Sequence, residues 1–353
     1  MNLEAKNHRE TPEAKPKAGS TRKTGHRPAS VDTEDVSRQA GDRGGCRHFV
    51  SLAELSADEA AFLVEHTIQL KRGDIDGRRT SLLLGQTLGL IFEKPSLRTR
   101  VSFEAAMARL GGNSIFLRGK DVGLGVRESV ADFARVISQY VDALAVRTFS
   151  QSVVEELAHH ATIPVINALS DSAHPCQAMA DMVTILEQCG PLPGKKLVFV
   201  GDGNNVASSL ALASALLDVD FVLTSPAGYE FPAEFVSQFQ AVFPHVSLKL
   251  EPDPRKAVKG ADVIYTDVWA SMGQEHEADL RREVFKPFQV NEALLAKARS
   301  GAIFLHCLPA HRGEEVTSAV LDGPQSRVIP QAANRMHFQM ALLTWLLGTS
   351  PGP

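Results

Sequence analysis

The stretch EKPSLRTRVSFE, residues 93–104, combines side chains that suit the binding of a phosphate group. Ser96 and Thr99 offer hydroxyl donors. Arg98 and Arg100 offer guanidinium groups that form paired hydrogen bonds with phosphate oxygens. An apolar run precedes the stretch, so EKPSLRTR is predicted to be a turn from a strand into a helix at 101–110, whose free N–H groups and dipole attract anions. The sequence therefore predicts an anion site, and the lack of a GxxxxGK loop argues against a nucleoside triphosphate.

Two arginines at a helix start also have a simpler interpretation, because solvated surface arginines are common. The helix dipole disfavours a basic side chain in the first turn by a few tenths of a kcal/mol to about 1 kcal/mol. A bound anion would offset that cost for Arg98 and Arg100, which favours the binding site over the simpler interpretation.

Further groups of reactive or polar residues follow predicted strands or open predicted helices. Taken alone, each has an ordinary explanation, such as a helix cap for His174, a small buried side chain for Cys307 or a turn cap for Asp267. Because the carboxyl ends of parallel strands share one edge of a sheet, all of these groups are expected to meet at one cleft. They are Arg147; His174, Cys176 and Gln177; Asn204 and Asn205; Asp267, Ser271 and Met272; His306 and Cys307; and Arg335, which is expected to open the last helix.

Two other ligand classes fit the sequence less well. LVFVGDGNNVAS contains Gly201 and Gly203 of a dinucleotide-binding pattern, but Val206 stands at the third glycine and no acidic residue ends the next strand. Histidine and cysteine occur in the HPCQ and HCLP segments, but no pair has the spacing of a structural zinc site. Neither a metal nor an organic cofactor is expected.

The elements that must position these residues alternate between short apolar runs and amphipathic helical stretches. Apolar strands that alternate with helices predict parallel sheets covered on both faces. Ser56 with Glu59 three residues later predicts the capped start of a helix, and residues 174–189 are predicted to form a long one. The strands are predicted at 87–92, 114–117, 142–146, 164–167, 197–201, 220–224, 246–250, 262–266 and 302–306.

A segment with proline and glycine, PLPGKK at 191–196, interrupts the alternation and predicts a domain boundary. The expected fold class is α/β, with two doubly wound parallel-sheet lobes and the active site in the cleft between them. The expected parts are a disordered tail at 1–44, a first domain at 45–190, a second domain at 191–330, and a C-terminal helix at 331–353 that packs back on the first domain.

The composition limits the function classes. The chain has 353 residues and a formal net charge of −4, which gives no support for a nucleic-acid surface, and no apolar run is long enough to cross a bilayer. The four cysteines are scattered without a CxxC pair, as is typical of free thiols in a reducing compartment. Residues 1–44 hold nine basic and seven acidic residues, whereas a mitochondrial transit peptide is poor in acids. A cytoplasmic location is expected.

The segments FEKPSLRTRVSFE, HPCQAMAD, GDGNN, DVWASMGQE and HCLPAHRGEEV together resemble the aspartate/ornithine carbamoyltransferases, over roughly residues 47–348. DVWASMGQE and HCLPAHRGEEV resemble the members that act on ornithine. The resemblance implies transfer of the carbamoyl group of carbamoyl phosphate to the δ-amine of L-ornithine, giving L-citrulline and phosphate. The same residues would serve arginine biosynthesis or the reverse reaction in arginine catabolism. No cofactor is implied.

The resemblance also implies an assembly and a division of labour. A homotrimer or a multiple of trimers is expected, with a loop near 118–127 reaching into a neighbour's site. The first domain would bind carbamoyl phosphate and the second would bind ornithine. Carbamoyl phosphate is expected to contact Ser96, Leu97, Arg98, Thr99, Arg147, His174, Gln177, Cys307, Leu308 and Arg335. Ornithine is expected to contact Asn205, Asp267, Ser271 and Met272.

The catalytic set implied by the resemblance agrees with the chemistry of carbamoyl transfer; it contains Arg147, His174, Asp267 and Cys307. Attack on the carbonyl group places negative charge on its oxygen, which Thr99, Arg147 and His174 are suited to stabilise. The attacking amine must be neutral, and Asp267 and Cys307 are expected to position it and tune its pKa. A covalent intermediate on Cys307 is not needed, because the departing phosphate can take up a proton.

Two positions depart from the family pattern. Threonine is usual where this chain has Leu97, which removes a hydroxyl donor but keeps the backbone N–H. Glutamine is common in the crossing loop where this chain has Gly123, and Lys120 or Arg127 are candidates to replace that phosphate contact.

Three alternative functions remain at the level of sequence. The first is a carbamoyltransferase for N-acetyl- or N-succinylornithine, against which DVWASMGQE argues because it supplies groups for a free α-amine and carboxylate. The second is a carbamoyltransferase for putrescine, against which HPCQ in place of HPTQ argues. The third is a non-catalytic paralogue that binds carbamoyl phosphate, against which the intact His174, Asp267 and Cys307 argue.

Overall fold

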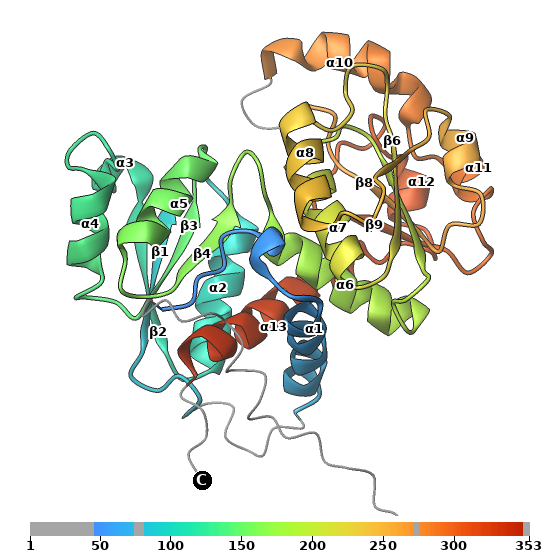
Figure 1. The fold of residues 1–353 in the computed structure, drawn as a ribbon. Helices are drawn as coiled ribbons and strands as arrows, with labels where there is room; N and C mark the ends of the chain where they lie inside the picture. The colour runs from blue at the N-terminus through green and yellow to red at the C-terminus, as the bar shows by residue number, and fades with distance from the viewer. Residues whose placement is uncertain (1–45, 74–80, 271–274, 349–353) are drawn as a thin grey trace, which may run out of the picture. The chain divides into compact units, whose positions relative to one another are not determined.

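Two parallel β-sheets form the framework of the computed structural model, which describes residues 46–73, 81–270 and 275–348 (Figure 1). Among these residues, the first sheet has four strands in the order β2-β1-β3-β4, and the second has five in the order β7-β6-β5-β8-β9. All strand pairs in both sheets are parallel. The predicted α/β class with two parallel sheets is therefore confirmed. The predicted tail at 1–44 lies outside the described residues.

Each of the predicted apolar runs overlaps one strand. The strands are β1 (Thr87–Phe92), β2 (Asn113–Arg118), β3 (Ala143–Arg147), β4 (Val165–Leu169), β5 (Lys196–Val200), β6 (Asp220–Thr224), β7 (Lys249–Leu250), β8 (Val263–Thr266) and β9 (Ile303–His306). The prediction at 246–250 was too long, because β7 is an edge strand that pairs only with β6 and both of its residues are exposed.

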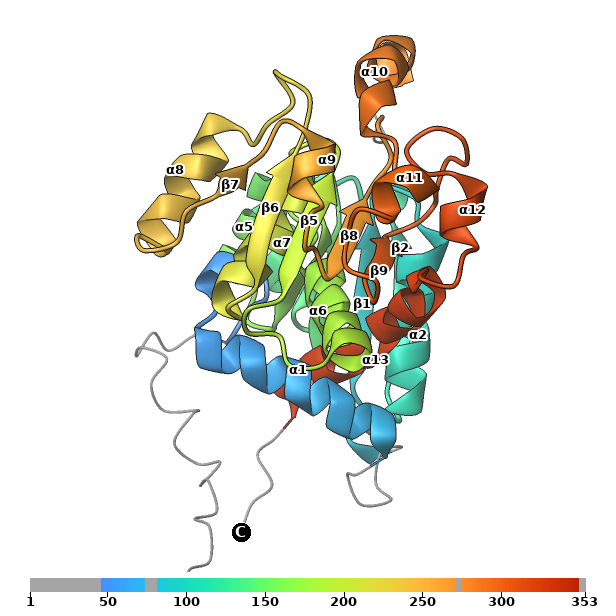
Figure 2. The ribbon, with the colours of Figure 1, turned by 90° about the vertical axis from the view of Figure 1, so that its right-hand side faces the viewer.

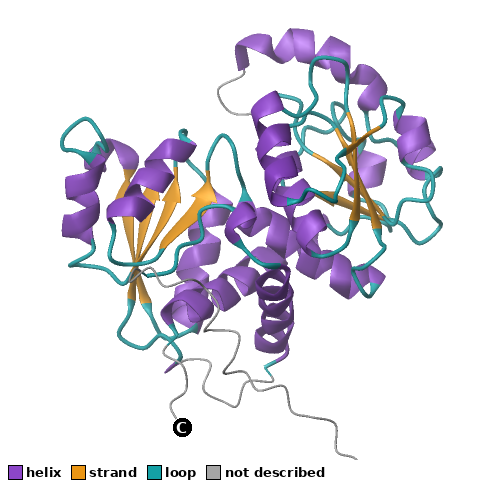
Figure 3. Cartoon of the chain, in the orientation of Figure 1, coloured by secondary structure: helices purple, strands orange, loops and turns teal. Residues whose placement is uncertain are grey.

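Helices occupy most of the segments between the strands (Figure 3). They are α1 (Ala57–Arg72), α2 (Leu97–Arg109), α3 (Gly119–Val122), α4 (Val130–Ile137), α5 (Gln151–His160), α6 (Pro175–Cys189), α7 (Asn205–Leu216), α8 (Ala233–Val242), α9 (Pro254–Ala257), α10 (Ala278–Phe285), α11 (Glu292–Leu295), α12 (Ser318–Leu321) and α13 (Val328–Leu347). The predicted capping box of α1 is confirmed, since the Ser56 side chain accepts from the Glu59 N–H and the Glu59 side chain accepts from the Ser56 N–H. In the described part of the chain, no helix is both long and apolar enough to cross a membrane.

Each sheet buries apolar side chains on both faces, because neighbouring residues of a strand point to opposite sides. In β1, Leu88 and Leu90 join one core, while Ile91 joins a second core under α4 and α5. In β5, Leu197 and Phe199 join the same core as Leu88, while the intervening Val198 packs with the helices on the far side. The two sheets therefore share one continuous core. Because each sheet is also covered on its other face, its strands appear in the sequence as uninterrupted apolar runs.

Helices α1, α6, α7 and α13 contribute buried side chains to this shared core. Helix α13 contacts α1, α2 and α6, and α6 also contacts α7; α1, α6 and α13 lie side by side in Figures 1 and 2. The prediction that Arg335 opens the last helix was wrong. Helix α13 begins at Val328, and Val328 and Gln331 of its first turn extend its buried side. The domain limits at 190 and 330 stay a prediction.

A buried polar group joins α1, α6 and α13 at their crossing. The Asn334 side chain is fully buried, and its Nδ2 donates to Thr184 Oγ1 at 2.9 Å and to Glu187 Oε2 at 2.8 Å. Lys71 Nζ donates to Asn334 Oδ1 at 2.7 Å and pairs with Glu187 at 2.7 Å. Every hydrogen-bonding atom of the Asn334 amide group is thus engaged, which fixes the register of α13 against α6.

Both sheets reverse their winding direction beside a central strand. In the first sheet β1 lies between β2 and β3, and in the second β5 lies between β6 and β8. Chain connections leave such strands in opposite directions, which opens a crevice at the carboxyl ends of the strands. The segments at these ends begin at Glu93 after β1, at Thr148 after β3, at Gly201 after β5 and at Asp267 after β8.

Replacing Asn334 with alanine is expected to lower the free energy of unfolding by about 2–3 kcal/mol, because it leaves buried polar partners unsatisfied. Urea unfolding followed by circular dichroism measures the change. Gln238→Ala, which removes an exposed side chain from α8, is the control and should alter stability by less than about 0.5 kcal/mol. Equal effects of the two variants would show that the crossing does not depend on this group.

Candidate active site

A cleft of about 1310 Å³ lies at the carboxyl ends of the central strands of both sheets. Its walls come from the segments after β1, β3, β4, β5, β8 and β9 and from α13. Most of the residues expected at a shared site line it, namely Ser96, Leu97, Arg98, Thr99, Arg147, His174, Asn205, Asp267, Cys307, Leu308 and Arg335. Gln177 is buried and does not line the cleft, and Ser271 and Met272 lie outside the described residues.

The first wall is the N-terminus of α2. Helix α2 begins at Leu97, four residues earlier than the predicted helix at 101, because the Ser96 Oγ caps it by accepting from the Thr99 N–H at 3.3 Å. The Ser96 hydroxyl also donates to Thr99 Oγ1 at 3.0 Å. No acidic residue lies in the first turn. The helix start therefore presents N–H groups and hydroxyls to the cleft without a carboxylate to neutralise the dipole.

Only one of the two arginines in this turn faces the cleft. Arg98 is exposed and lines it, whereas Arg100 donates from Nε to Glu104 at 2.8 Å and lies 3.9 Å over the Phe116 ring. The expectation that both arginines bind one phosphate was wrong for Arg100, because residues two apart on a helix point in different directions.

Three guanidinium groups reach the same end of the cleft from three elements. Arg98 comes from α2, Arg147 from the end of β3, and Arg335 from α13. Arg335 donates to Thr99 Oγ1 at 2.6 Å. Within the described ranges, none of the three forms an ion pair with a carboxylate.

The same grouping shifts the pKa values of the arginines. Burial, and then the charges of Arg335 and Arg98, lower the pKa of Arg147 to about 10. Burial likewise lowers the pKa of Arg335. Like charges that face one another without a counter-ion are costly, so this end of the cleft is suited to an anion.

His174 adds a neutral donor beside these cations. It occupies the N-cap position of α6 but makes no capping bond through its side chain, so the simple explanation as a helix cap was wrong. Its backbone N–H donates to Ser209 Oγ at 2.8 Å, which holds the residue in place, and its Nδ1 has no partner among the described residues. Burial, then the charges of Arg335 and Arg147, hold the pKa of His174 well below its usual value. The imidazole is therefore uncharged near pH 7 and can donate one hydrogen bond.

A second part of the cleft holds a carboxylate fixed by three donors. Asp267 Oδ1 accepts from the Cys307 thiol at 3.0 Å and from the Val268 N–H at 2.8 Å, and its Oδ2 accepts from Asn204 Nδ2 at 3.0 Å. Burial, then the negative charge of Asp267, raises the pKa of Cys307 well above its usual value. Cys307 is thus a thiol that donates to Asp267, and it lacks the thiolate character of a nucleophile.

Two further residues that line the cleft, Asn205 and Leu308, are held in defined conformations. The Nδ2 of Asn205 donates to the Ser170 carbonyl at 2.7 Å, which links the start of α7 to the segment after β4. Leu308 has φ 58°, a left-handed conformation that residues other than glycine rarely adopt. Its N–H donates to His306 Nδ1 at 2.9 Å, so the backbone after Cys307 is held by a side chain from the preceding strand.

Several lining residues were not assigned a role from the sequence. Lys94 pairs with Asp171 and lies 4.5 Å from the centre of the Phe149 ring. Lys94 belongs to the first motif, so its position in the strand-to-helix turn was a usable signal. Asn204, which the sequence placed beside Asn205 without a role, caps α7 and holds Asp267.

No signal in the sequence indicates a role for Arg281, because its partner Asp202 is far away in the chain. Its Nη1 donates to Asp202 at 2.7 Å and to the Trp269 carbonyl at 3.0 Å, and its Nε donates to Glu277 at 3.0 Å. Arg281 therefore connects the loop after β5 with the chain on both sides of residues 271–274. No local pattern predicts a partner 79 residues away.

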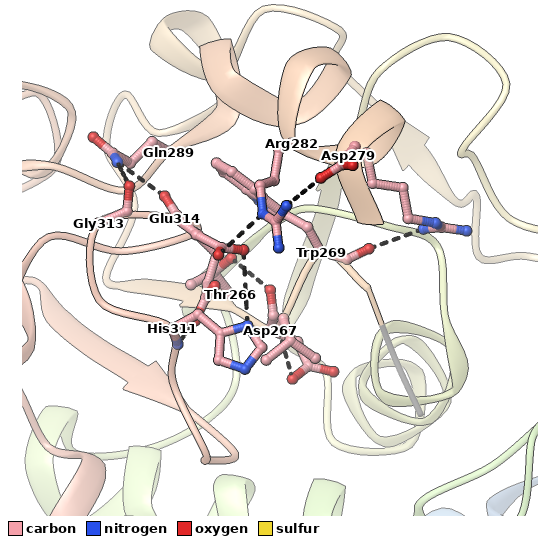
Figure 4. Close-up of polar contacts among 12 residues, drawn as sticks. Thr266, Asp267, Trp269, Asp279, Arg282, Gln289, His311, Gly313 and Glu314 are labelled. Carbon is pink, nitrogen blue, oxygen red and sulfur yellow. Dashed lines mark hydrogen bonds and ion pairs between the residues drawn. The ribbon is translucent and has the colours of Figure 1, made fainter. Parts of the chain in front are cut away.

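The next residue, Arg282, anchors α10 on its other side. Its guanidinium group bridges Asp279 of α10 and Glu314, which belongs to the segment after β9 (Figure 4). Gln289 Nε2 donates to the Gly313 and Glu314 carbonyls at 2.9 Å each. These contacts tie the segment that carries Cys307 to the segment that follows Asp267.

Asp267, His306 and Cys307 also form a group with metal-type donors. However, His306 Nε2 contacts Glu315 at 3.2 Å and its Nδ1 accepts from Leu308. Asp267 and Cys307 are the donors that remain, which is fewer than a zinc site uses.

Comparison with known proteins places the chain among carbamoyltransferases. Residues 47–187 match the family model described as "Aspartate/ornithine carbamoyltransferase, carbamoyl-P binding domain", and residues 193–346 match "Aspartate/ornithine carbamoyltransferase, Asp/Orn binding domain". The chain is 51% identical over 303 residues to an ornithine carbamoyltransferase from Anoxybacillus flavithermus, covering 85% of this chain and 96% of the relative. An ornithine carbamoyltransferase named anabolic, from Pyrococcus furiosus, is 51% identical over 305 residues, covering 86% and 96%.

Solved structures give the same picture. The ornithine carbamoyltransferase structure from Pyrococcus furiosus matches with a TM-score of 0.82 and 50% identity, covering 86% of this chain and 97% of that one. The structure from Thermus thermophilus matches with a TM-score of 0.76 and 42% identity, covering 84% and 98%.

A neutral His174 makes stability depend on pH in a defined direction. Its native pKa lies well below its unfolded value, so below about pH 6.5 the unfolded chain takes up a proton that the native protein does not. The free energy of unfolding should therefore fall as the pH drops from about 6.5 to 5, by up to about 1.4 kcal/mol per pH unit from this group. His174→Gln should reduce that slope in urea unfolding, whereas His245→Gln, on an exposed loop, should not. An unchanged slope in His174→Gln would contradict a buried neutral imidazole.

Proposed function

The chain belongs to the aspartate/ornithine carbamoyltransferase family, and from this premise we propose that it catalyses the ornithine carbamoyltransferase reaction. The carbamoyl group of carbamoyl phosphate moves to the δ-amine of L-ornithine, and L-citrulline and phosphate are the products. The observation that carries this proposal is that one cleft holds two kinds of group. It has three guanidinium groups without carboxylate partners among the described residues, and a carboxylate, Asp267, that is fixed by donors.

The cationic part of the cleft is suited to the phosphate of carbamoyl phosphate. The N–H groups at the start of α2, the Ser96 and Thr99 hydroxyls and the Arg98 guanidinium are donors that match phosphate oxygens. Leu97 contributes its backbone N–H as the first residue of α2, which does not depend on its side chain. The loss of the hydroxyl that threonine would supply at this position therefore leaves the helix-start donors in place.

The carbamoyl group fits beside the phosphate, against Arg147 and His174. When the amine attacks, negative charge develops on the carbonyl oxygen, and donors fixed in advance stabilise it best. Arg147 supplies a charged donor and the neutral His174 supplies an uncharged one, with Thr99 held in place by Arg335. Because His174 is already neutral, it polarises the carbonyl group without giving up a proton.

The fixed carboxylate is suited to the attacking amine. Asp267 attracts the cationic side chain of ornithine, and the neutral Cys307 thiol orients the carboxylate by donating to it. The ammonium group first loses one proton to solvent, which gives the neutral amine that attacks. The amine loses a second proton as the C–N bond forms and the C–O bond to phosphate breaks, and the departing phosphate takes up that proton. Asn205, Ser271 and Met272 are proposed to hold the α-amino and α-carboxylate groups; the last two lie outside the described residues.

The charges around Asp267 favour an unblocked amino acid over N-acetyl- or N-succinylornithine. Asp202, Glu230, Asp267 and Glu277 line this side of the cleft, and Arg281 balances two of them. The remaining negative charge suits the free α-ammonium of ornithine, which a blocked ornithine lacks. Putrescine carries no α-carboxylate, the group for which Asn205, Ser271 and Met272 are proposed.

We also propose a homotrimer, or a multiple of trimers, in the cytoplasm. Strand β2 is an edge of the first sheet, and large apolar side chains are exposed on it and beside it. They are Leu97, Val101, Ile115 and Val126. Lys120 and Arg127 lie in the loop next to this edge and do not line the cleft of their own chain, which supports their use in a neighbour's site. The cysteines at 46, 176, 189 and 307 are all free thiols, as a reducing compartment allows.

Citrulline formation from carbamoyl phosphate and L-ornithine tests the reaction. N-Acetylornithine, N-succinylornithine, putrescine and aspartate serve as alternative acceptors in parallel assays. Turnover should require ornithine, and Cys307→Ala should lower kcat by roughly 10- to 100-fold while leaving measurable activity, because only a positioning donor is lost. Turnover with a blocked ornithine or with putrescine would refute the proposed substrate. Complete loss in Cys307→Ala would instead indicate covalent catalysis, and no turnover with any acceptor would favour a non-catalytic paralogue.

The oligomeric state is tested by light scattering coupled to size-exclusion chromatography. The full chain should elute with about three times its mass of 38.2 kDa, or a multiple of that value. Ile115→Glu should dissociate the assembly, because a charge would be buried at the β2 edge. Val242→Glu, on the exposed side of α8, is the control and should leave the mass unchanged. A monomeric wild type would contradict the proposal.

A further inference from the structure

A chain of buried side chains runs behind the cleft and has no role in the mechanism above. The Gln177 side chain lies on α6 one turn after His174, and its Nε2 donates to Asp181 Oδ1 at 2.8 Å. Gln331 on α13 donates from Nε2 to the same Asp181 oxygen at 2.7 Å. The Gln331 Oε1 accepts from the His306 backbone N–H at 2.9 Å. Asp181, Gln177, Gln331 and His306 are all at least 99% buried.

The direction of every hydrogen bond in this series of side chains follows from the His306 backbone N–H at its end. The His306 N–H can only donate, so the Gln331 oxygen must face it and the Gln331 NH₂ must face Asp181. Asp181 Oδ1 must therefore act as an acceptor. The Gln177 amide then has to present its NH₂ to that oxygen, which turns its own oxygen away. The orientation of Gln177 is thus determined by an N–H group on β9, next to Cys307.

The result is a buried acceptor with nothing to accept from. Gln177 Oε1 has no hydrogen-bond partner among the described residues, although it is fully enclosed. Buried polar groups are almost always paired, because leaving one unpaired is costly. His174 Nδ1, three residues earlier on the same helix face, is unpaired as well. His174 lines the cleft and Gln177 lies behind it, one turn further along α6, so these two unpaired polar atoms indicate a place for a ligand group at the start of α6.

We propose that Asp181, held by Gln331, is a positioning residue that keeps the Gln177 oxygen facing the NH₂ group of carbamoyl phosphate. It thereby makes the site selective for a carbamoyl group over an acetyl group. This inference rests on the proposed function, since it assumes that carbamoyl phosphate is the donor substrate. An acetyl group has nearly the same shape, but its methyl group offers no hydrogen to the Gln177 oxygen. A buried acceptor left unpaired rejects an analogue that lacks the donor.

The Gln177 amide keeps its orientation whether Asp181 is protonated or ionised. Burial raises the pKa of Asp181 to about 7, against the opposing effect of the hydrogen bonds from Gln331 and Gln177. Both amides donate to Asp181 Oδ1 and neither donates to Oδ2, so Oδ2 is the oxygen that can carry a proton, and the Tyr265 hydroxyl also interacts with Asp181. Oδ1 then remains an acceptor for both amides, and the Gln177 oxygen stays turned away from Asp181.

The test compares two stable phosphonates that differ only in the discriminating group. Phosphonoacetamide carries the NH₂ of a carbamoyl group, and 2-oxopropylphosphonate carries a methyl group in its place. Calorimetric Kd values for both are measured on the full-length wild type and on Gln177→Met, Asp181→Leu and the double variant. The wild type should prefer the amide on the order of 10- to 100-fold, and each single variant should reduce that preference to less than about threefold.

The double variant separates positioning from direct contact. If Asp181 acts through Gln177, Asp181→Leu should change the amide preference by less than about twofold once Gln177 is methionine. Asp181→Asn is the matched control, because its Oδ1 still accepts from both amides and the preference should be kept. Gln331→Met removes the residue that holds Asp181 and should lower the preference too. It serves as the second variant if Asp181→Leu does not fold, as judged by circular dichroism.

Three outcomes would overturn the inference. The first is an unchanged amide preference in both Asp181→Leu and Gln331→Met. The second is an equal weakening of both phosphonates, which general packing damage would produce. The third is an effect of Asp181→Leu that persists in full when Gln177 is methionine. Wild-type citrulline formation is measured on the same samples, so an inactive wild type marks a failure of the proposed function, whereas an active wild type with any of these outcomes refutes the positioning role alone.

Discussion

The repulsion among three guanidinium groups is the constraint on which the rest of the site depends. Arg98, Arg147 and Arg335 come from a helix start, a strand end and the last helix, and no carboxylate in the described part of the chain pairs with them. A protein gains no stability from such a grouping, and burial together with the charges of Arg335 and Arg98 lowers the pKa of Arg147. The fold therefore has to hold these side chains in place by other means, and an anion that binds among them relieves the repulsion.

The helices that join the two sheets hold these side chains in place. Helix α13 carries Arg335 into the site and is fixed against α6 by the buried amide groups of Gln331 and Asn334. Helix α6 carries His174, whose backbone is held by Ser209 of α7, and α7 is tied to the segment after β4 through Asn205. The guanidinium groups and the carboxylate are thus positioned by one shared core, so the two substrates meet in a geometry that neither domain would provide alone.

Much of this arrangement could be predicted from the sequence, because it depends on local patterns. Apolar runs of four to six residues marked the strands, and motifs at the ends of those runs marked the cleft. The start of α2 was misjudged because the Ser96 cap was not recognised as the helix boundary, and this error also assigned Arg100 to the phosphate. The start of the helix that carries Arg335 was placed too late, because no side-chain cap marks its true start at Val328.

What the sequence could not provide are the partnerships between distant residues. Arg281 with Asp202, Asn204 with Asp267, and Gln331 with Asp181 each join segments far apart in the chain, and no spacing rule connects them. The direction of the Gln177 amide is the extreme case, since it follows from a backbone N–H on another element. Such partnerships depend on the packing of the shared core, which becomes visible only in three dimensions.

The central claim is that these unpaired guanidinium groups form an anion site, and thermal unfolding with added inorganic phosphate tests it most directly. At constant ionic strength, phosphate should raise the Tm of the wild type and of Arg100→Met, because Arg100 faces Glu104 and Phe116 instead of the cleft. The shift should be largely lost in Arg98→Met, whose exposed side chain is not needed for folding. An equal phosphate shift in Arg98→Met, or a loss of the shift in Arg100→Met alone, would contradict the account.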